Sequence, residues 1–186
     1  MRGKQDTSER ELIESVRAGD RTAYGALVEP HLPRLLGLAR RMLGSGDEAE
    51  DAVQCALAST WVARVKLDPG RPAGAYLATV TLNKCRDRLR RRKAARLLGF
   101  ASFEAELPVA SEEPSAEARL ADRQMLEKVG HAIERLPVRL REALVLVAID
   151  GRSQREAADL LGVTEKAIET RIRRARQRLR NRLDFL

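Results

Sequence analysis

Aromatic residues and cysteines are both scarce in this chain of 186 residues. Aromatic side chains make up 3% of the residues, so hydrophobic cores must consist mainly of leucine, valine and alanine. The two cysteines, Cys55 and Cys85, belong to no CxxC pair and have no histidine beside them, which argues against a disulfide scaffold and a zinc site. We expect both to be buried as small hydrophobic side chains, and we expect no metal and no cofactor.

Long apolar segments are missing as well. No stretch of about 18 residues is apolar and free of charge, as a membrane-spanning helix would require. Residues 1–14 are charged from the second residue onward and lack the apolar segment of a signal peptide. We therefore expect a cytoplasmic protein without membrane insertion. Runs of β-branched residues are also absent, whereas the helix formers alanine, leucine, arginine and glutamate dominate, so the composition predicts an all-α fold.

Positive charge is what the sequence has in excess. Lysine and arginine number 35 against 27 acidic residues, a net charge of +8 that favours a polyanionic partner. Residues 86–96 contain seven basic side chains, and residues 171–182 contain seven arginines and no acid. Residues 102–122, between these blocks, carry six acids and two prolines, a composition typical of a poorly ordered linker.

This charge pattern predicts two small helical domains joined by a flexible acidic linker. The first domain is expected at residues 1–98, the linker at 99–116 and the second domain at 117–186. Apolar spacing and capping residues predict the individual helices. Those of the first domain are expected at residues 10–18, 20–29 with Asp20 as N-cap, 32–43 ending at Gly44, 47–61 with Asp47 as N-cap, and 75–92. Those of the second are expected at residues 120–136, 138–149 with Pro137 in the first turn, 154–161 with Ser153 as N-cap, and from Thr164 to about 183.

Residues 154–172 have the spacing of a helix-turn-helix motif. Ala158 is small enough for two helices to cross closely, Gly162 supplies a positive φ in the turn, and Ile168 packs the second helix onto the first. The second helix is then expected to enter the major groove of DNA. An ordinary pair of antiparallel helices has the same spacing, but the arginines of residues 171–182 favour DNA binding.

Several segments in order resemble the extracytoplasmic-function (group 4) sigma factors of bacterial RNA polymerase. The likeness is clear at residues 47–61, DEAEDAVQCALASTW, of which 50–61 are similar to region 2.2 of that family, and residues 34–43 are similar to region 2.1. The segment 76–92, which ends NKCRDRLRRR, resembles regions 2.3 and 2.4. Residues 136–149, LPVRLREALVLVAI, resemble region 4.1, and residues 153–179 resemble region 4.2. The likeness extends over nearly the whole chain.

The resemblance implies a sigma factor that binds core RNA polymerase at the β′ clamp helices and the β flap. It implies reading of the minus ten and minus 35 promoter elements, help in promoter melting, and control by an anti-sigma factor. Such a factor is not an enzyme, and we expect a monomer when it is free. Its partners are the polymerase, promoter DNA and the anti-sigma protein.

The family motifs assign candidate residues to three surfaces. Candidates for the minus 35 element are Thr164, Lys166, Ala167, Glu169, Thr170, Arg171, Arg173 and Arg174. Candidates for the minus ten element are Tyr76, Asn83, Arg86, Arg88, Arg90 and Arg91. Candidates for polymerase binding are Asp51, Gln54, Leu57 and Trp61.

The chain departs from the family pattern at three places. Cys55 stands where the family usually has an acid, and Leu57 where an aromatic is common. The segment 68–76, DPGRPAGAY, is one residue shorter than the usual loop and lacks its phenylalanine. Tyr76 is the one aromatic available there for base stacking, which contributes about 1 to 3 kcal/mol per base. Alternatively, Tyr76 is a core residue. We expect Trp61 to be a core residue as well.

Two other function classes fit the sequence less well. A dimeric helix-turn-helix regulator needs a dimer surface, and no spare apolar helix remains once the two cores are filled. A nucleotide-hydrolysing enzyme needs a phosphate-binding GxxxxGK[ST] loop, which is absent. His31 and His131 lie far apart in the sequence and show no catalytic pattern.

Overall fold

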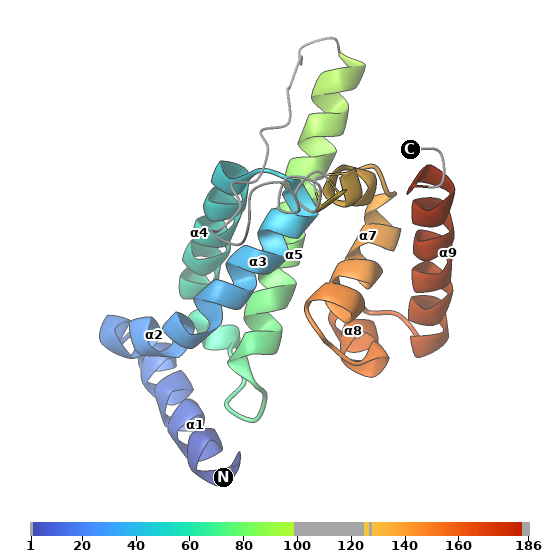
Figure 1. Cartoon of the computed structure of the whole chain (residues 1–186). Coiled ribbons are helices and arrows are strands. Elements are labelled where there is room, and N and C mark those ends of the chain that lie inside the picture. Colours follow the sequence, from blue (N-terminus) through green and yellow to red (C-terminus); the bar gives the residue numbers. More distant parts are fainter. Residues whose placement is uncertain (1, 99–124, 127, 184–186) are drawn as a thin grey trace, which may run out of the picture.

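The computed structural model describes residues 2–98, 125–126 and 128–183, with side chains from residue 9 onward. All regular structure in these segments is helical (Figure 1). The first part of the chain consists of α1 (Arg2–Ala18), α2 (Arg21–Val28), η1 (Glu29–His31), α3 (Leu32–Leu43), α4 (Gly46–Val62), η2 (Arg64–Lys66) and α5 (Ala73–Leu97). The second part consists of helical turns at residues 128–134 followed by α7 (Val138–Leu144), η3 (Val145–Ile149), α8 (Gln154–Leu161) and α9 (Glu165–Leu183). The all-α prediction is confirmed, and the predicted linker at 99–116 lies outside the described residues.

Local capping side chains set the starts of α2, α4, α8 and α9. Asp20 accepts hydrogen bonds from the backbone N–H of Thr22 and Ala23, as an N-cap does. Gly44 ends α3 in the left-handed region at φ 73°. The prediction of Asp47 as the next N-cap is wrong, because Ser45 occupies that position with extended backbone and accepts from the N–H of Glu48. Asp47 lies instead in the first turn, where a carboxylate interacts favourably with the helix dipole.

Three other helices differ from their predicted bounds. Helix α1 begins at Arg2 rather than at residue 10, and α5 runs from Ala73 to Leu97, well beyond the predicted 75–92. Pro137 is the N-cap of α7 rather than a residue of its first turn. After Leu144 the helix widens into a π-helical segment, η3, in which the N–H of Asp150 donates to the carbonyl of Val145 at 2.8 Å. The start of the predicted helix 120–136 lies outside the described residues.

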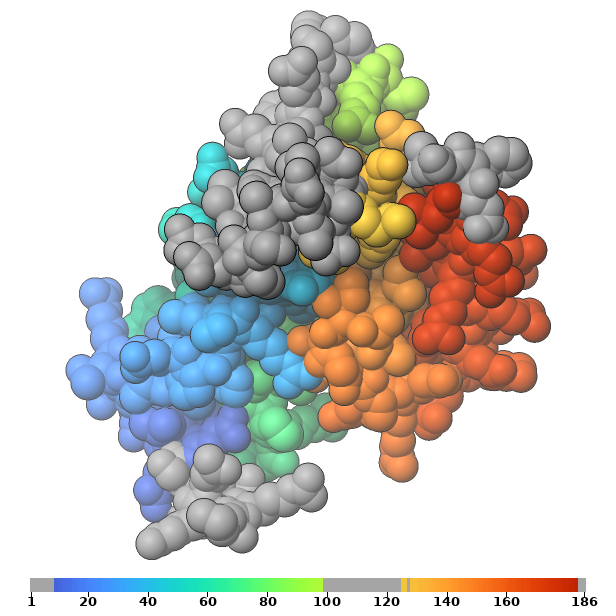
Figure 2. Space-filling model, in the orientation of Figure 1, coloured from blue at the N-terminus to red at the C-terminus, as the bar shows by residue number. Residues whose placement is uncertain are grey.

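The main hydrophobic core joins both parts of the chain. It contains Leu38 and Met42 of α3 and Leu82 of α5 together with Leu146 of η3 and Ile168 of α9, each at most 3% exposed. Smaller cores lie between α1, α2 and the start of α5, and between α7 and α9. In Figure 1, α7 and α8 lie beside α5 and α3, and Figure 2 shows that the two parts meet without a gap on this face. Two separate cores were expected, whereas the structure has one core that both parts of the chain share. We call this the closed arrangement.

The two cysteines have different environments. Cys85 is fully buried within α5, as predicted. Cys55 is exposed, and the prediction that it is buried is wrong. On α4 the alanines and valine Ala52, Val53 and Ala56 turn inward and are buried, which leaves Cys55 on the solvent side of the same helix.

The described helices show no span long and apolar enough to cross a membrane. The described residues also contain no group of three or more histidine, cysteine, aspartate or glutamate side chains arranged to hold a metal ion.

Candidate nucleic-acid interface

Helices α8 and α9 form a helix-turn-helix whose local contacts follow from its sequence. Ser153 and Glu156 form a reciprocal capping box at the start of α8. The backbone N–H and the hydroxyl of Ser153 both donate to the Glu156 carboxylate at 2.8 Å, and they hold the pKa of this carboxyl below its ordinary value because they stabilise its charged form. Gly162 has φ 63°, as the turn was expected to require. Thr164 then caps α9 by accepting from the N–H of Ala167 at 3.2 Å.

The packing of this motif leaves one face of α9 free for contacts outside the protein. Ala158 of α8 and Ile168 of α9 are buried, as the spacing predicted, and Ile172 of α9 is buried as well. Thr164, Lys166, Glu169, Arg173 and Arg174 are exposed, whereas Ala167, Thr170 and Arg171 are half-buried. Lys166 pairs with Glu169 at 3.1 Å, so the first turns of this face are close to neutral.

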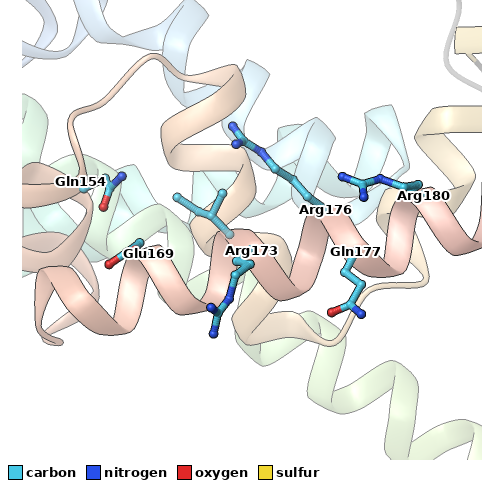
Figure 3. Close-up of a pocket in the computed structure, with 7 residues that line it drawn as sticks. Gln154, Glu169, Arg173, Arg176, Gln177 and Arg180 are labelled. Carbon is cyan, nitrogen blue, oxygen red and sulfur yellow. The ribbon is translucent and has the colours of Figure 1, made fainter.

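The seven arginines of residues 171–182 make the rest of α9 strongly positive. Among the described residues, none of them lies within ion-pair distance of an acid. Arg173, Arg176 and Arg180 line a shallow hollow of about 380 Å³ beside Gln154 and Gln177. Figure 3 shows Arg176 and Arg180 projecting from one side of α9 and Arg173 and Gln177 from another. Guanidinium groups without a partner are well suited to phosphate oxygens.

The basic face of α5 differs, because acids of the same chain already neutralise much of it. Arg88 lies 3.3 Å from Asp51 of α4, and Arg90 lies 3.8 Å from Asp87. Arg92 is paired with Glu48 and donates to the carbonyl of Leu43 at 2.8 Å. Within the described segments, Arg91 is exposed and has no such partner.

Helix α4 carries the four residues predicted to bind polymerase. Asp51 and Gln54 are exposed, and Leu57 is half-buried, with its carbonyl accepting from the hydroxyl of Tyr24 at 2.7 Å. That tyrosine has its pKa raised to about 12 by burial. Trp61 was expected in the core, but it is only half-buried. Its ring packs against that of Tyr24, with the two ring centroids 5.3 Å apart.

Sequence reasoning missed two features beside Trp61. The guanidinium groups of Arg21 and Arg64 lie 5.8 Å and 5.0 Å from the Trp61 ring, in cation–π contact. Val62, the last residue of α4, and Val65 of η2 are 77% and 62% exposed, so they form an uncovered apolar edge where these two elements meet. The signal for that edge was present in the sequence, since both valines fall outside the inward stripe Val53, Ala56 and Thr60.

Comparison with known proteins decides the family. Residues 27–95 match Sigma-70 region 2, and residues 126–179 match Sigma-70, region 4. The chain is 37% identical to the RNA polymerase sigma factor CnrH of Cupriavidus metallidurans over 96% of both chains. It is 34% identical to the ECF RNA polymerase sigma factor SigM of Mycobacterium tuberculosis over 99% of this chain and 89% of that one. The chain belongs to the ECF sigma factors of the sigma-70 family.

Two solved sigma factor structures resemble the whole fold. CnrH in complex with the cytosolic domain of CnrY has a TM-score of 0.68 and 34% identity, covering 95% of this chain and 97% of that one. The sigma factor RpoE of Bartonella quintana, in complex with the anti-sigma factor NepR, has the same TM-score and 26% identity. That match covers 84% of this chain and 94% of RpoE.

In this sigma factor, region 2 and region 4 are tied together by buried charges. Glu142 of α7, 2% exposed, forms an ion pair with Arg86 of α5, which also donates to the side-chain oxygen of Asn83 at 2.8 Å. The neighbouring Arg141 is 5% exposed and donates to the carbonyl of Met42 on α3 at 2.5 Å and to that of Leu136 at 3.3 Å.

Burial is the main influence on Arg141, and it lowers the pKa of the guanidinium. A third contact between the regions lies at the surface, where Arg34 of α3 pairs with Asp150 at 2.7 Å. Sequence reasoning missed all three contacts, although the charged pair Arg141–Glu142 directly before the apolar run 143–149 was a visible signal.

An open groove separates the loop before α5 from α8. It has a volume of about 820 Å³, and Tyr76, Thr79 and Arg71 line it on the region 2 side. Arg152, Glu156 and Asp159 line it on the region 4 side. Tyr76 is half-buried and packs at the margin of the core formed by α1 and α2, so its two readings, core residue and base-stacking residue, are compatible with one position.

Proposed function

We propose that this sigma factor is a non-catalytic initiation factor that acts in the cytoplasm by directing core RNA polymerase to specific promoters. In this proposal the first domain, residues 1–98, binds the β′ clamp helices and the minus ten element. The second, residues 117–186, binds the β flap and the minus 35 element, and residues 99–116 link them. The observation that carries the proposal is the well-formed helix-turn-helix followed by seven arginines without acidic partners among the described residues.

The minus 35 role rests on the geometry of α9. A recognition helix enters the major groove with its first turns against base edges, while later residues contact the phosphates. The neutral, polar start of α9 suits base contacts by Thr164, Lys166 and Glu169, and the arginine-rich remainder suits the DNA backbone. With about six phosphate contacts, the logarithm of the binding constant should fall with the logarithm of salt with a slope of about −5.

The minus ten and polymerase roles rest on the adjacent faces of α5 and α4. The Arg88–Asp51 pair joins a residue proposed for DNA to a residue proposed for polymerase, so the two surfaces are contiguous. The exposed Val62 and Val65 extend the proposed polymerase surface beyond Gln54 and Trp61 with apolar area.

The closed arrangement has to open before both elements can be read. Elements centred about 25 base pairs apart lie roughly 85 Å apart along B-DNA at 3.4 Å per base pair. A compact chain of this length has a radius of gyration of about 16 Å, far too small to span that distance. Opening also releases Arg86 from Glu142, so the closed form is unable to use Arg86 on DNA.

Control by an anti-sigma partner is the second part of the proposal. The resembling structures of CnrH and RpoE are complexes with CnrY and with the anti-sigma factor NepR. We infer that a partner of this kind binds the closed form and retains it. A stand-alone dimeric regulator is not favoured, because the match to region 2 would have no role in such a protein.

The test is transcription with purified bacterial core polymerase on a pool of upstream fragments from the genome that encodes this sigma factor. We expect transcripts that depend on the factor and share two upstream elements. Sequence-specific duplex binding by the protein alone, with neither polymerase association nor transcripts, would favour the regulator instead.

Promoter binding by the holoenzyme, measured at several salt concentrations, tests α9 through matched variants. Arg173→Ala should weaken promoter binding by the holoenzyme for all sequences alike and reduce the magnitude of the salt slope by about 1, as loss of one phosphate contact does. Arg139→Ala, which removes the same charge from an exposed site on α7, is the control. Equal effects of the two substitutions would contradict the assignment of α9 to DNA.

A further inference from the structure

The loop between η2 and α5 is held at both of its ends by one helix, α1. At the first end, the guanidinium of Arg17 donates to the carbonyl of Leu67 at 3.3 Å. At the second end, the N–H of Ala73 donates to the carboxylate of Glu9 at 2.8 Å. Glu9 and Arg17 are eight residues apart on α1, so the two anchor points are separated by about 12 Å along the helix axis.

Apolar packing supports the same two anchor points. Leu67 and Ala73 are each 2% exposed and share a core with Ile13 and Val16 of α1. The residues between them turn outward: Asp68, Gly70, Arg71 and Pro72 are exposed. Asp68 accepts from the N–H of Gly70 at 2.9 Å, which closes a tight turn at the tip. The loop thus has fixed ends and a presented tip.

Glu9 also supplies the cap that α5 lacks in its own sequence. The first N–H groups of a helix have no partner within the helix, and the residue at the N-cap position of α5 is Pro72, whose side chain has no oxygen to accept from them. The Glu9 carboxylate takes one of these N–H groups from across the fold, and it lies 4.0 Å from the Nε2 atom of His31. The first turn of α5, fixed in this way, carries Tyr76.

We propose that α1 is a positioning element for promoter melting, with Glu9 and Arg17 as positioning residues that act through the loop 67–73 and the start of α5. This inference rests on the proposed minus ten role of region 2. Arg71 of the loop and Tyr76 of the first turn of α5 both line the region 2 side of the open groove, the side that remains when region 4 moves away on opening. Because α1 orders both segments before DNA arrives, the separated strand meets a preformed surface and less conformational entropy is lost on binding.

The test compares Glu9→Ala with Glu9→Gln and with Glu11→Ala, an exposed acid on the same helix. Open-complex formation by the holoenzyme is measured through permanganate reactivity of unpaired minus ten thymines. Glu9→Ala should reduce it about tenfold, the size of effect expected for one hydrogen bond to a charged group. Affinity for core polymerase and for minus 35 duplex should not change. Glu9→Gln keeps an oxygen that accepts from Ala73 and should restore most of the opening, and Glu11→Ala should match the wild type.

Hydrogen exchange of the free protein gives a readout that is independent of the promoter. The Ala73 amide should exchange faster in Glu9→Ala than in Glu11→Ala, and Arg17→Ala should reduce promoter opening in the same direction as Glu9→Ala. Wild-type opening by the Glu9→Ala holoenzyme would overturn the proposal. Equal losses of polymerase binding and of opening would also overturn it, because Glu9 would then serve folding alone. If the wild-type protein binds core polymerase but the resulting holoenzyme opens no promoter, the minus ten role on which the proposal rests would be overturned instead.

Discussion

The surroundings of a single side chain decide its chemistry in this sigma factor, as the two thiols show. Burial within α5 raises the pKa of the Cys85 thiol to about 12, so this group is neither accessible nor ionised near neutral pH. Cys55 belongs to the same residue type and also lies within a helix, but it faces solvent. Which face of α4 turns inward depends on the packing of its neighbours.

We predict that one thiol per chain reacts with an aromatic disulfide reagent at pH 8 in the native protein and two react in guanidinium chloride. Cys55→Ser should abolish the native reaction, and Cys85→Ala should leave it intact. Rapid native labelling of both thiols would show that α5 opens readily.

Buried charge at the residue scale has a larger effect than charge at the surface. Arg141 and Glu142 are adjacent in the sequence, yet one hydrogen-bonds region 2 through a backbone carbonyl of α3 and the other through a guanidinium of α5. Removing one partner of a buried pair leaves the other charge without compensation, which costs about 3 to 5 kcal/mol. Exposed pairs such as Lys166–Glu169 contribute about 0 to 1 kcal/mol.

At the scale of single elements, local hydrogen bonds set the helix boundaries. The Ser153–Glu156 capping box starts α8, Gly162 ends it in the left-handed region, and Thr164 starts α9. Each of these interactions spans at most four residues, and each was predicted from the sequence, apart from the contribution of Glu156. Residue type alone did not place every cap: Asp47 was the predicted N-cap of α4, whereas Ser45, two residues earlier, occupies that position.

The lowered pKa of Glu156 makes the stability of the helix-turn-helix depend on pH. Because the folded-state pKa is below the unfolded value, the ionised carboxylate stabilises the fold above the unfolded pKa of about 4.3. That contribution is lost as the pH falls through the folded pKa. We predict that urea unfolding of the wild type and of Glu156→Gln differs at pH 7, in favour of the wild type, and converges at low pH. The same difference at pH 7 and at low pH would contradict the charge-based account of this cap.

At the scale of the whole molecule, the decisive feature is that region 2 and region 4 share one core. Leu38 and Met42 meet Leu146 and Ile168 there, and the buried pair Arg86–Glu142 lies at the same boundary. Arg86 is also proposed to bind the minus ten element. The closed form and the DNA-bound form therefore compete for this side chain.

We predict that Glu142→Gln shifts the protein towards an open form. The radius of gyration measured by small-angle scattering should rise, while the helical circular dichroism stays unchanged. Glu165→Gln, at an exposed acid of α9, is the control and should leave the radius at its wild-type value. An unchanged radius in Glu142→Gln would mean that apolar packing alone keeps the regions closed.

The sequence by itself determined the helical class, most of the caps, the helix-turn-helix and the resemblance to sigma factors. These depend on interactions between residues a few positions apart, or on motifs that are contiguous in the chain. Only the tertiary structure decided that Arg86 meets Glu142 across 56 positions, that Glu9 caps α5 across 64, and that Cys55 faces solvent. Such contacts arise when helices pack against one another, and local periodicity carries no information about which faces meet.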